Sequence, residues 1–269
     1  AQAGRDEAGS HITALMLAIE QARFEQDLDL SARLIDVALA RLPEIDDPDA
    51  RRDNSLQLKT YQLTLANAHG DYPKALAIGQ ALLRERIAAF GETDVRVAVD
   101  WYNIGVTLSL LERHVEAGDA AQRTLDILKA NPTSPESRQA LAQLSLCVAY
   151  FGTGSLTAAR EAAASSVEIA ARTLGVENWV YQVALSCAAR AAIHSGDLAA
   201  AGAVLDQLPP PDKTADPSTG LQAKMLRAEI AWRQGRYAEL EQTMTELRAM
   251  TVTQGARTAQ VILMRDALE

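Results

Sequence analysis

Residues 101–121 read WYNIGVTLSLLERHVEAGDAA, and this stretch decides the fold. Its first half lies within a predicted helix, residues 94–112. Glu112 then marks a turn, His114 follows two residues later, and Ala117 follows three residues after that. A polar turn residue frees the backbone, a ring packs back on the first helix, and a small residue lets two helix axes come close. The stretch therefore predicts two antiparallel helices joined by a tight turn.

The same pattern recurs along the chain at a nearly constant interval. Predicted turns lie 42 residues apart at Leu28, Gly70, Glu112, Gly154 and Gly196, and a sixth follows after 39 residues at Gly235. Two residues after these turns come Leu30, Tyr72, His114, Leu156, Leu198 and Tyr237. The small residue three positions later is Ala75, Ala117, Ala159 or Ala201, and the first and last units have Arg33 and Leu240 instead. An internal period of this length indicates a helical repeat array.

Helix signals flank the predicted turns. Asp47-Pro48 and Ser134-Pro135 are typical of a helix N-cap followed by proline in the first turn. No stretch sustains the alternation of a β-strand. The predicted helices cover 11–26, 29–42, 48–69, 72–90, 94–112, 115–130, 135–152, 156–174, 178–195, 197–208, 218–234, 236–250 and 256–268.

The pattern around Trp101 resembles a tetratricopeptide repeat (TPR). The run Trp101-Tyr102-Asn103-Ile104-Gly105, with Glu112, His114 and Ala117, matches that family, and Gly70-Asp71-Tyr72-Pro73-Lys74-Ala75 matches its turn. The 42-residue period and Phe90-Gly91-Glu92-Thr93-Asp94 resemble the longer kinesin light chain-like type. Leu174-Gly175-Val176-Glu177 repeats that feature 84 residues later, which is two periods. The resemblance covers most of residues 11–250.

The repeat reading predicts an all-α fold. One helix pair cannot bury its apolar faces alone, so neighbouring pairs stack into a solenoid. We expect a right-handed α-solenoid (superhelix) of about six antiparallel pairs plus a C-terminal capping helix. Residues 11–269 would form a single repeat domain, with a Pro-rich inter-repeat loop at 209–217. We expect residues 1–10 to be a disordered or vector-derived N-terminal segment.

The resemblance also implies a concave binding surface lined by the first helix of each pair. Carried over to this sequence, its groove residues are Tyr102, Val106, Ser109, Leu144, Val148, Phe151, Arg190, Ile193, Met225 and Trp232. Aromatic and arginine residues often dominate the binding energy of interfaces. Two alternatives stay open: these residues form an exposed groove, or tight curvature packs them as ordinary core. The terminal helix, with Val261, Ile262, Met264 and Leu268 on one side, would cap the last pair.

Composition excludes several classes of protein. Hydrophobic residues make up 48% of the 269 positions, which is enough for a sizeable core. The formal net charge of −9 disfavours a general nucleic-acid binder or a ligand of anionic membranes. No apolar run is long enough to span a bilayer, so we expect no membrane contact by this segment. The chain begins at Ala1 without methionine, and we expect an excised domain or a processed product.

Candidate catalytic residues are few. His69, His114 and His194 lie at or beside predicted turns, and none of the four histidines has the spacing of a zinc site. Cys147 and Cys187 lie within predicted first helices, and we expect buried free cysteines. A disulfide or a reactive thiol is the alternative. The sequence therefore predicts no metal, no cofactor and no enzymatic activity.

Three short motifs allow a functional and a structural interpretation. Gly152-Thr153-Gly154-Ser155 could bind an anion at a helix N-terminus, but it is in register with the repeat and lacks the lysine of a phosphate loop, which favours a turn. Arg51-Arg52-Asp53-Asn54 resembles part of a kinase catalytic loop but lacks its other parts, and it reads as a helix start. The acidic residues Asp46, Asp47 and Asp49 suit a helix N-terminus, where the dipole favours negative charge.

These observations favour a non-catalytic interaction module that binds a protein or peptide on its concave face. The resemblance suggests the regulatory domain of a larger bacterial signalling protein, such as a Ser/Thr kinase or a transcription regulator. That protein would place it in the cytoplasm or the periplasm. The alternatives are a small-molecule or signal-peptide sensor and a homodimerisation device.

Overall fold

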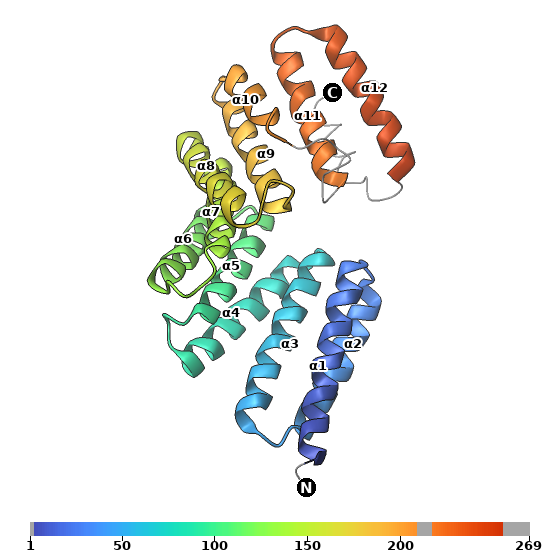
Figure 1. The fold of residues 1–269 in the computed structure, drawn as a ribbon, viewed down its shortest axis with the longest axis vertical. Helices are drawn as coiled ribbons and strands as arrows, with labels where there is room; N and C mark the ends of the chain where they lie inside the picture. Colours follow the sequence, from blue (N-terminus) through green and yellow to red (C-terminus); the bar gives the residue numbers. More distant parts are fainter. Residues whose placement is uncertain (1–2, 209–216, 255–269) are drawn as a thin grey trace. The chain divides into compact units, whose positions relative to one another are not determined.

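The computed structural model describes residues 3–208 and 217–254 and is all-helical (Figure 1). Over these residues there is no β-strand. The helices are α1 (Ala3–Phe24), α2 (Leu28–Arg41), α3 (Pro48–Ala68), α4 (Tyr72–Phe90), α5 (Val95–Leu110), α6 (His114–Ala130), α7 (Ser137–Gly152), α8 (Leu156–Thr173), α9 (Trp179–His194), α10 (Leu198–Leu205), α11 (Pro217–Arg233) and α12 (Tyr237–Gln254). A short 3₁₀ turn, η1 (Leu42–Glu44), follows α2.

Each odd-numbered helix packs against the even-numbered helix that follows it, as Figure 1 shows for the paired ribbons. The predicted six helix pairs are therefore confirmed. The predicted helix 256–268 and most of the predicted loop 209–217 lie outside the described residues. Residues 3–10 are helical, where we expected a disordered or vector-derived segment. This stretch contains no proline, so no residue in it lacks the backbone N–H that a helix needs.

Contacts group the chain into two units, residues 1–135 and 136–269, called unit 1 and unit 2 below. Unit 1 contains α1–α6 and unit 2 contains α7–α12. One core cluster of unit 1 joins Ile19, Ile35 and Leu58, which come from three successive helices. A core cluster of unit 2 joins Ile193, Leu205 and Ile230 in the same manner. In each unit, a helix pair thus buries its apolar side chains against the next pair.

All six turns within the helix pairs have the same backbone geometry. The turn residues with positive φ are Gln26, Gly70, Glu112, Gly154, Gly196 and Gly235. At Gly70, its own N–H donates to the Asn67 carbonyl, and the next N–H, of Asp71, donates to the Ala66 carbonyl. This is the Schellman arrangement, and the other five turns repeat both hydrogen bonds. A positive φ suits glycine, which explains why the period was visible in the sequence.

The first turn corrects the predicted register. The residue with positive φ is Gln26, not a residue at Leu28, and it precedes Gly70 by 44 positions rather than 42. In the corrected register the residue two positions on is Leu28, and the small residue is Ser31, which is fully buried. Arg33 was therefore not an exception to the pattern, because it does not occupy the position of the small residue.

Helix starts follow the predicted capping chemistry. Asp47 directly precedes Pro48, and its side chain accepts a hydrogen bond from the Asp49 N–H. Asp71 and Asp197 cap α4 and α10 in a similar way. The four alanines after the turns at Gly70, Glu112, Gly154 and Gly196 are buried, at Ala75, Ala117, Ala159 and Ala201. Small residues at these places let the two helices of a pair approach closely.

Candidate functional site

The predicted groove residues of unit 1 lie on α5. Tyr102, Val106 and Ser109 are half-buried, one helical turn apart. Burial raises the pKa of the Tyr102 hydroxyl above its usual value, so this group stays protonated and can donate or accept hydrogen bonds. These three side chains are neither fully enclosed nor fully exposed.

The predicted groove residues of unit 2 fall into three groups. Leu144 and Ile193 are buried, and Ile193 belongs to the core cluster of unit 2. Half-buried residues are Val148, Phe151, Arg190 and Met225. Trp232, near the end of α11, is 55% exposed. Because Leu144 and Ile193 are shielded from solvent, the reachable surface consists of the other five side chains.

The structure brings together Phe151 of α7 with Arg190 and His194 of α9. The Arg190 guanidinium carbon lies 4.8 Å from the centre of the Phe151 ring. His194 meets the same ring edge-on, with ring centres 5.0 Å apart and an interplanar angle of 88°. Arg190 and His194 are four positions apart on α9, so they share one helix face. Sequence reasoning placed Phe151 and Arg190 on one surface but treated His194 only as a turn residue.

Charged residues of α11 lie beyond this cluster. Glu229 accepts hydrogen bonds from Nε and Nη2 of Arg233 at 3.0 and 2.8 Å. Arg233 also reaches back to the Ile193 carbonyl of α9 at 3.5 Å. Burial lowers the pKa of Arg190, and the Glu229 charge acts in the opposite direction. The two arginines therefore share one nearby carboxylate, which is already bound by Arg233.

A disulfide joins Cys147 of α7 to Cys187 of α9, with Cα atoms 6.7 Å apart. Both residues are buried, as predicted, but the expectation of free cysteines is wrong and its disulfide alternative is correct. The two positions are 40 residues apart, close to one repeat period, so neighbouring first helices bring them face to face. That separation was the signal available in the sequence. The disulfide lies one helical turn before Phe151 on α7.

A buried ion pair joins α4 to α5 in unit 1. Arg86 Nε lies 2.9 Å from an oxygen of Asp100, and the two side chains are 8% and 0% exposed. Arg86 Nη2 also donates to the Thr60 hydroxyl at 3.3 Å. Burial raises the pKa of Asp100 to about 7, and the Arg86 charge opposes this increase. Sequence reasoning missed this pair.

Arg86 also takes over a simpler contact that is seen in the next two repeats. There, a hydroxyl of the second helix donates to a carbonyl of the first: Thr124 to Ala98 at 3.4 Å and Ser166 to Ala140 at 2.8 Å. The equivalent residue of α4 is Leu82, which cannot donate. Arg86, one turn later, supplies the polar link instead, because its Nη2 donates to the Leu56 carbonyl of α3 at 3.4 Å. The ion pair therefore has a structural role in unit 1.

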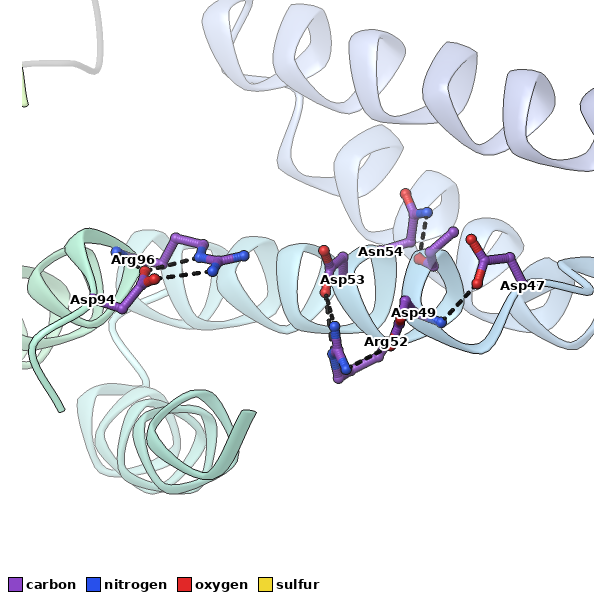
Figure 2. Close-up of polar contacts among 8 residues, drawn as sticks. Asp47, Asp49, Arg52, Asp53, Asn54, Asp94 and Arg96 are labelled. Carbon is purple, nitrogen blue, oxygen red and sulfur yellow. Dashed lines mark hydrogen bonds and ion pairs between the residues drawn. The ribbon is translucent and has the colours of Figure 1, made fainter. Parts of the chain in front are cut away.

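The motif Arg51-Arg52-Asp53-Asn54 is part of α3, as predicted. Figure 2 shows Arg52 between Asp49 and Asp53, at 2.8 and 3.1 Å, and Asp94 paired with Arg96 at the start of α5. The guanidiniums of Arg52 and Arg96 also lie over the Phe90 ring, with the Arg96 carbon 3.3 Å from its centre. These charges are neutralised locally, which indicates a surface ion-pair network.

The remaining motifs are also structural in the described residues. Gly154 has a φ of +76° and forms the predicted turn. His69 caps the end of α3, His114 begins α6 and His194 ends α9, which confirms their placement at turns. Over the described ranges, no three His, Cys, Asp or Glu side chains gather as a metal-binding group. In the same ranges, no helix combines the length and apolar character needed to cross a membrane.

Unit 1 contains a cavity of about 470 Å³ between α2, α3 and α4. Ile35, Leu65 and Ile78 are among its apolar lining residues, and Asp36 and Lys74 bring opposite charges to it. A second space of about 400 Å³ lies between the α1–α2 turn and α3. Neither cavity involves the predicted groove residues.

No protein-family model and no curated protein matches this sequence, but solved structures share its fold. RapI, solved in its apo form, aligns with a TM-score of 0.70 at 11% identity, over 89% of this chain and 84% of its own. PilW, a type IV pilus biogenesis factor, aligns with a TM-score of 0.63 at 16% identity, over 93% of this chain and 98% of its own. Nearly identical TPR-like repeats assigned to a Podosopora anserina kinesin light chain align with a TM-score of 0.58 at 16% identity, over 84% and 98%.

These likenesses define the class of protein as an all-α helical-repeat protein, as the sequence predicted. Within that class, the fold is the tetratricopeptide type, and its solved neighbours include the kinesin light chain-like variety. At these identities the likeness concerns the fold alone.

Proposed function

We propose that this chain is a non-catalytic module that binds a protein or peptide partner on its first helices. The observation that carries the proposal is the meeting of Phe151 and Arg190 across α7 and α9, with both side chains half-buried. Trp232 adds an exposed aromatic residue on α11, the next first helix along the chain. Aromatic and arginine side chains of this kind are common anchors of interfaces. A preformed surface also avoids the entropic cost of ordering itself during binding.

The proposed role of the module is regulatory. The resemblance to TPR arrays suggests a part of a larger bacterial signalling protein, such as a Ser/Thr kinase or a transcription regulator. A binding role needs no acid–base pair, which agrees with the turn positions of His69, His114 and His194. The mechanism is recognition by a rigid surface, and no bond is made or broken.

Selection of binders from a displayed peptide library tests this function. The full chain is immobilised, and the affinity of each selected peptide is measured for the wild type, Trp232→Ala and Phe151→Ala. We expect either substitution to weaken binding by about 1–3 kcal/mol if the residue is an anchor. Trp179→Ala is a matched control, because Trp179 is 45% exposed but lies at the opposite end of its helix, at the start of α9. Unchanged affinity in both test variants would remove this surface from the proposal.

Self-association is an alternative outcome of the same experiment. A molar mass of two chains at micromolar concentration, lost in Trp232→Ala, would assign the surface to a second copy of the chain. A molar mass of one chain would exclude self-association and leave a peptide or protein partner as the proposed ligand.

A small-molecule sensor is a second candidate because of the 470 Å³ cavity between α2, α3 and α4. Its apolar floor and opposite charges suit a small zwitterion. A concentration-dependent rise in melting temperature with such a compound would support this function. The rise should disappear in Asp36→Ala, because this variant removes one of the charged lining residues.

A further inference from the structure

The junction between the first two helix pairs differs from the next junction in what holds it together. Arg86 of α4 forms an ion pair with Asp100 of α5, so a polar contact ties the second pair to the third. Among the described residues, no side chain of α2 forms a hydrogen bond or an ion pair with α3 or α4. Apolar side chains such as Ile35 and Leu58 join α2 to α3 instead.

The cavity of about 470 Å³ lies at this junction, between α2, α3 and α4. Ile35, Leu65 and Ile78 line it with apolar surface, α2 contributes Asp36 and α4 contributes Lys74. A cavity of this volume, with an apolar lining and a few polar groups, has the usual composition of a small-molecule site.

The two charged residues of the cavity are both available to a ligand. Asp36 and Lys74 are exposed, and neither forms an ion pair with the other or with any further described residue. Asp71 also lines the cavity, but its side chain accepts a hydrogen bond from the Lys74 backbone N–H at 3.2 Å and caps α4. Two neighbouring second helices thus bring opposite charges to one cavity, beyond direct ion-pair distance of each other.

We propose that this cavity binds an aliphatic amino acid, whose ammonium group meets Asp36 and whose carboxylate meets Lys74. Its hydrocarbon part lies on Ile35, Leu65 and Ile78. The bound molecule bridges α2 and α4, and it supplies the polar link that this junction lacks. This inference rests on the second candidate function, the small-molecule sensor, and names the ligand class and its action on the fold.

Four probes test the ligand chemistry by calorimetric titration of the full chain. Leucine carries both charges on one carbon atom, and ε-aminocaproate carries them at opposite ends of a linear chain. Isoamylamine lacks the carboxylate of leucine, and isocaproate lacks its ammonium group. We expect one of the two amino acids to bind at least about fivefold more tightly than either single-charge analogue. The amino acid that does so identifies the spacing of charges that the cavity accepts.

Substitutions of the two charged residues test the bridge. Asp36→Asn and Lys74→Met should each remove the preference, because either change leaves one end of the ligand without a partner. The charge swap Asp36→Lys/Lys74→Asp should restore it, because a ligand turned end for end again meets an opposite charge on each helix. Matched controls are Asp29→Asn on α2 and Lys129→Met on α6, which change exposed charges outside the cavity lining and should keep the wild-type affinities.

Hydrogen exchange measures the action of the ligand on the junction. With the preferred amino acid bound, amide exchange should slow in both α2 and α4, and by more than in α7–α9. Slower exchange in only one of these two helices would overturn the bridge.

The possible results separate the inference from the function on which it rests. If isoamylamine or isocaproate binds as tightly as both amino acids, the cavity is still a ligand site, but the inference fails. A preference that survives in Asp36→Asn or Lys74→Met would also overturn it. If no probe binds, the inference and the sensor candidate fail together. The proposed peptide-binding surface is tested separately, by Trp232→Ala and Phe151→Ala.

Discussion

Arg86 in unit 1 and Arg190 in unit 2 both lie between packed helices, but their surroundings differ. Arg86 has Asp100, the Thr60 hydroxyl and a backbone carbonyl as partners, whereas Arg190 has an aromatic ring and, among the described residues, no carboxylate within ion-pair distance. Arg86 is buried and paired with a carboxylate, so it serves the fold, whereas Arg190 is half-buried and stacks on a ring. Arg86 is therefore the better source of structural predictions, and Arg190 of functional ones.

The largest effect should come from breaking the pair in unit 1. Arg86→Met leaves the Asp100 carboxylate buried without a cation, and we expect it to lower the free energy of unfolding by about 3–5 kcal/mol at pH 8. Urea unfolding measures this change. The double variant Arg86→Met/Asp100→Leu should recover most of the loss, because it buries no charge.

The cost of Arg86→Met should depend on pH. In the wild type the pKa of Asp100 is already raised to about 7, and the Arg86 charge that opposes the increase is absent in the variant. In the folded variant Asp100 therefore keeps a proton that the unfolded chain releases near pH 4. The stability that this protonated Asp100 gives to the folded state is present at low pH and is lost as pH rises through the folded-state pKa. A penalty at pH 5 as large as that at pH 8 would contradict this explanation.

The next effect concerns the disulfide that is present in unit 2 alone among the described residues. Its two cysteines are 40 residues apart, and removing the cross-link in Cys147→Ala/Cys187→Ala should lower the free energy of unfolding by about 2–4 kcal/mol. Hydrogen exchange should show the larger loss of protection in α7 and α9, with smaller changes in α1–α4. Equal changes throughout would contradict the assignment of this cross-link to the stability of unit 2. Because disulfides persist in oxidising compartments, we expect the bond to form in the periplasm and to be reduced in the cytoplasm.

The smallest effect compares one turn of each unit. Glu112 has a φ of +58° in unit 1, and Gly154 has a φ of +76° at the equivalent place in unit 2. Glu112→Gly should stabilise the protein by up to about 1 kcal/mol, because glycine adopts this conformation without strain. Gly154→Ala should destabilise it by about 1 kcal/mol, and thermal unfolding measures both. The same sign for the two substitutions would show that φ does not decide the preference at this position.

Most of the fold could be predicted because its turns depend on local chemistry. Five of the six turns were placed correctly, since positive φ selects glycine at four of them and the period supplied Glu112. The first turn was misplaced because Gln26 is not a glycine and its interval to the next turn is 44 residues. The local sequence around the turn does not indicate such a change in repeat length.

The candidate site was less predictable, because it depends on contacts between repeats. The resemblance placed Phe151 and Arg190 on one surface, but only the three-dimensional structure shows that the Arg190 guanidinium stacks on the Phe151 ring. Ile193 was also predicted to line the groove, but it is fully buried in the core cluster of unit 2. Arg86 and Asp100 are 14 positions apart on different helices, and nothing in either local sequence marks them as partners.

The repeated Schellman turns also have a consequence for folding kinetics. Each turn closes through hydrogen bonds between residues three to five positions apart, so a hairpin can form before any distant segment arrives. Most contacts between helices then join neighbours in the chain, which corresponds to a low contact order and fast folding. A hairpin anywhere in the array could act as the nucleus, and the order of folding would follow the local stability of the hairpins rather than their position in the chain.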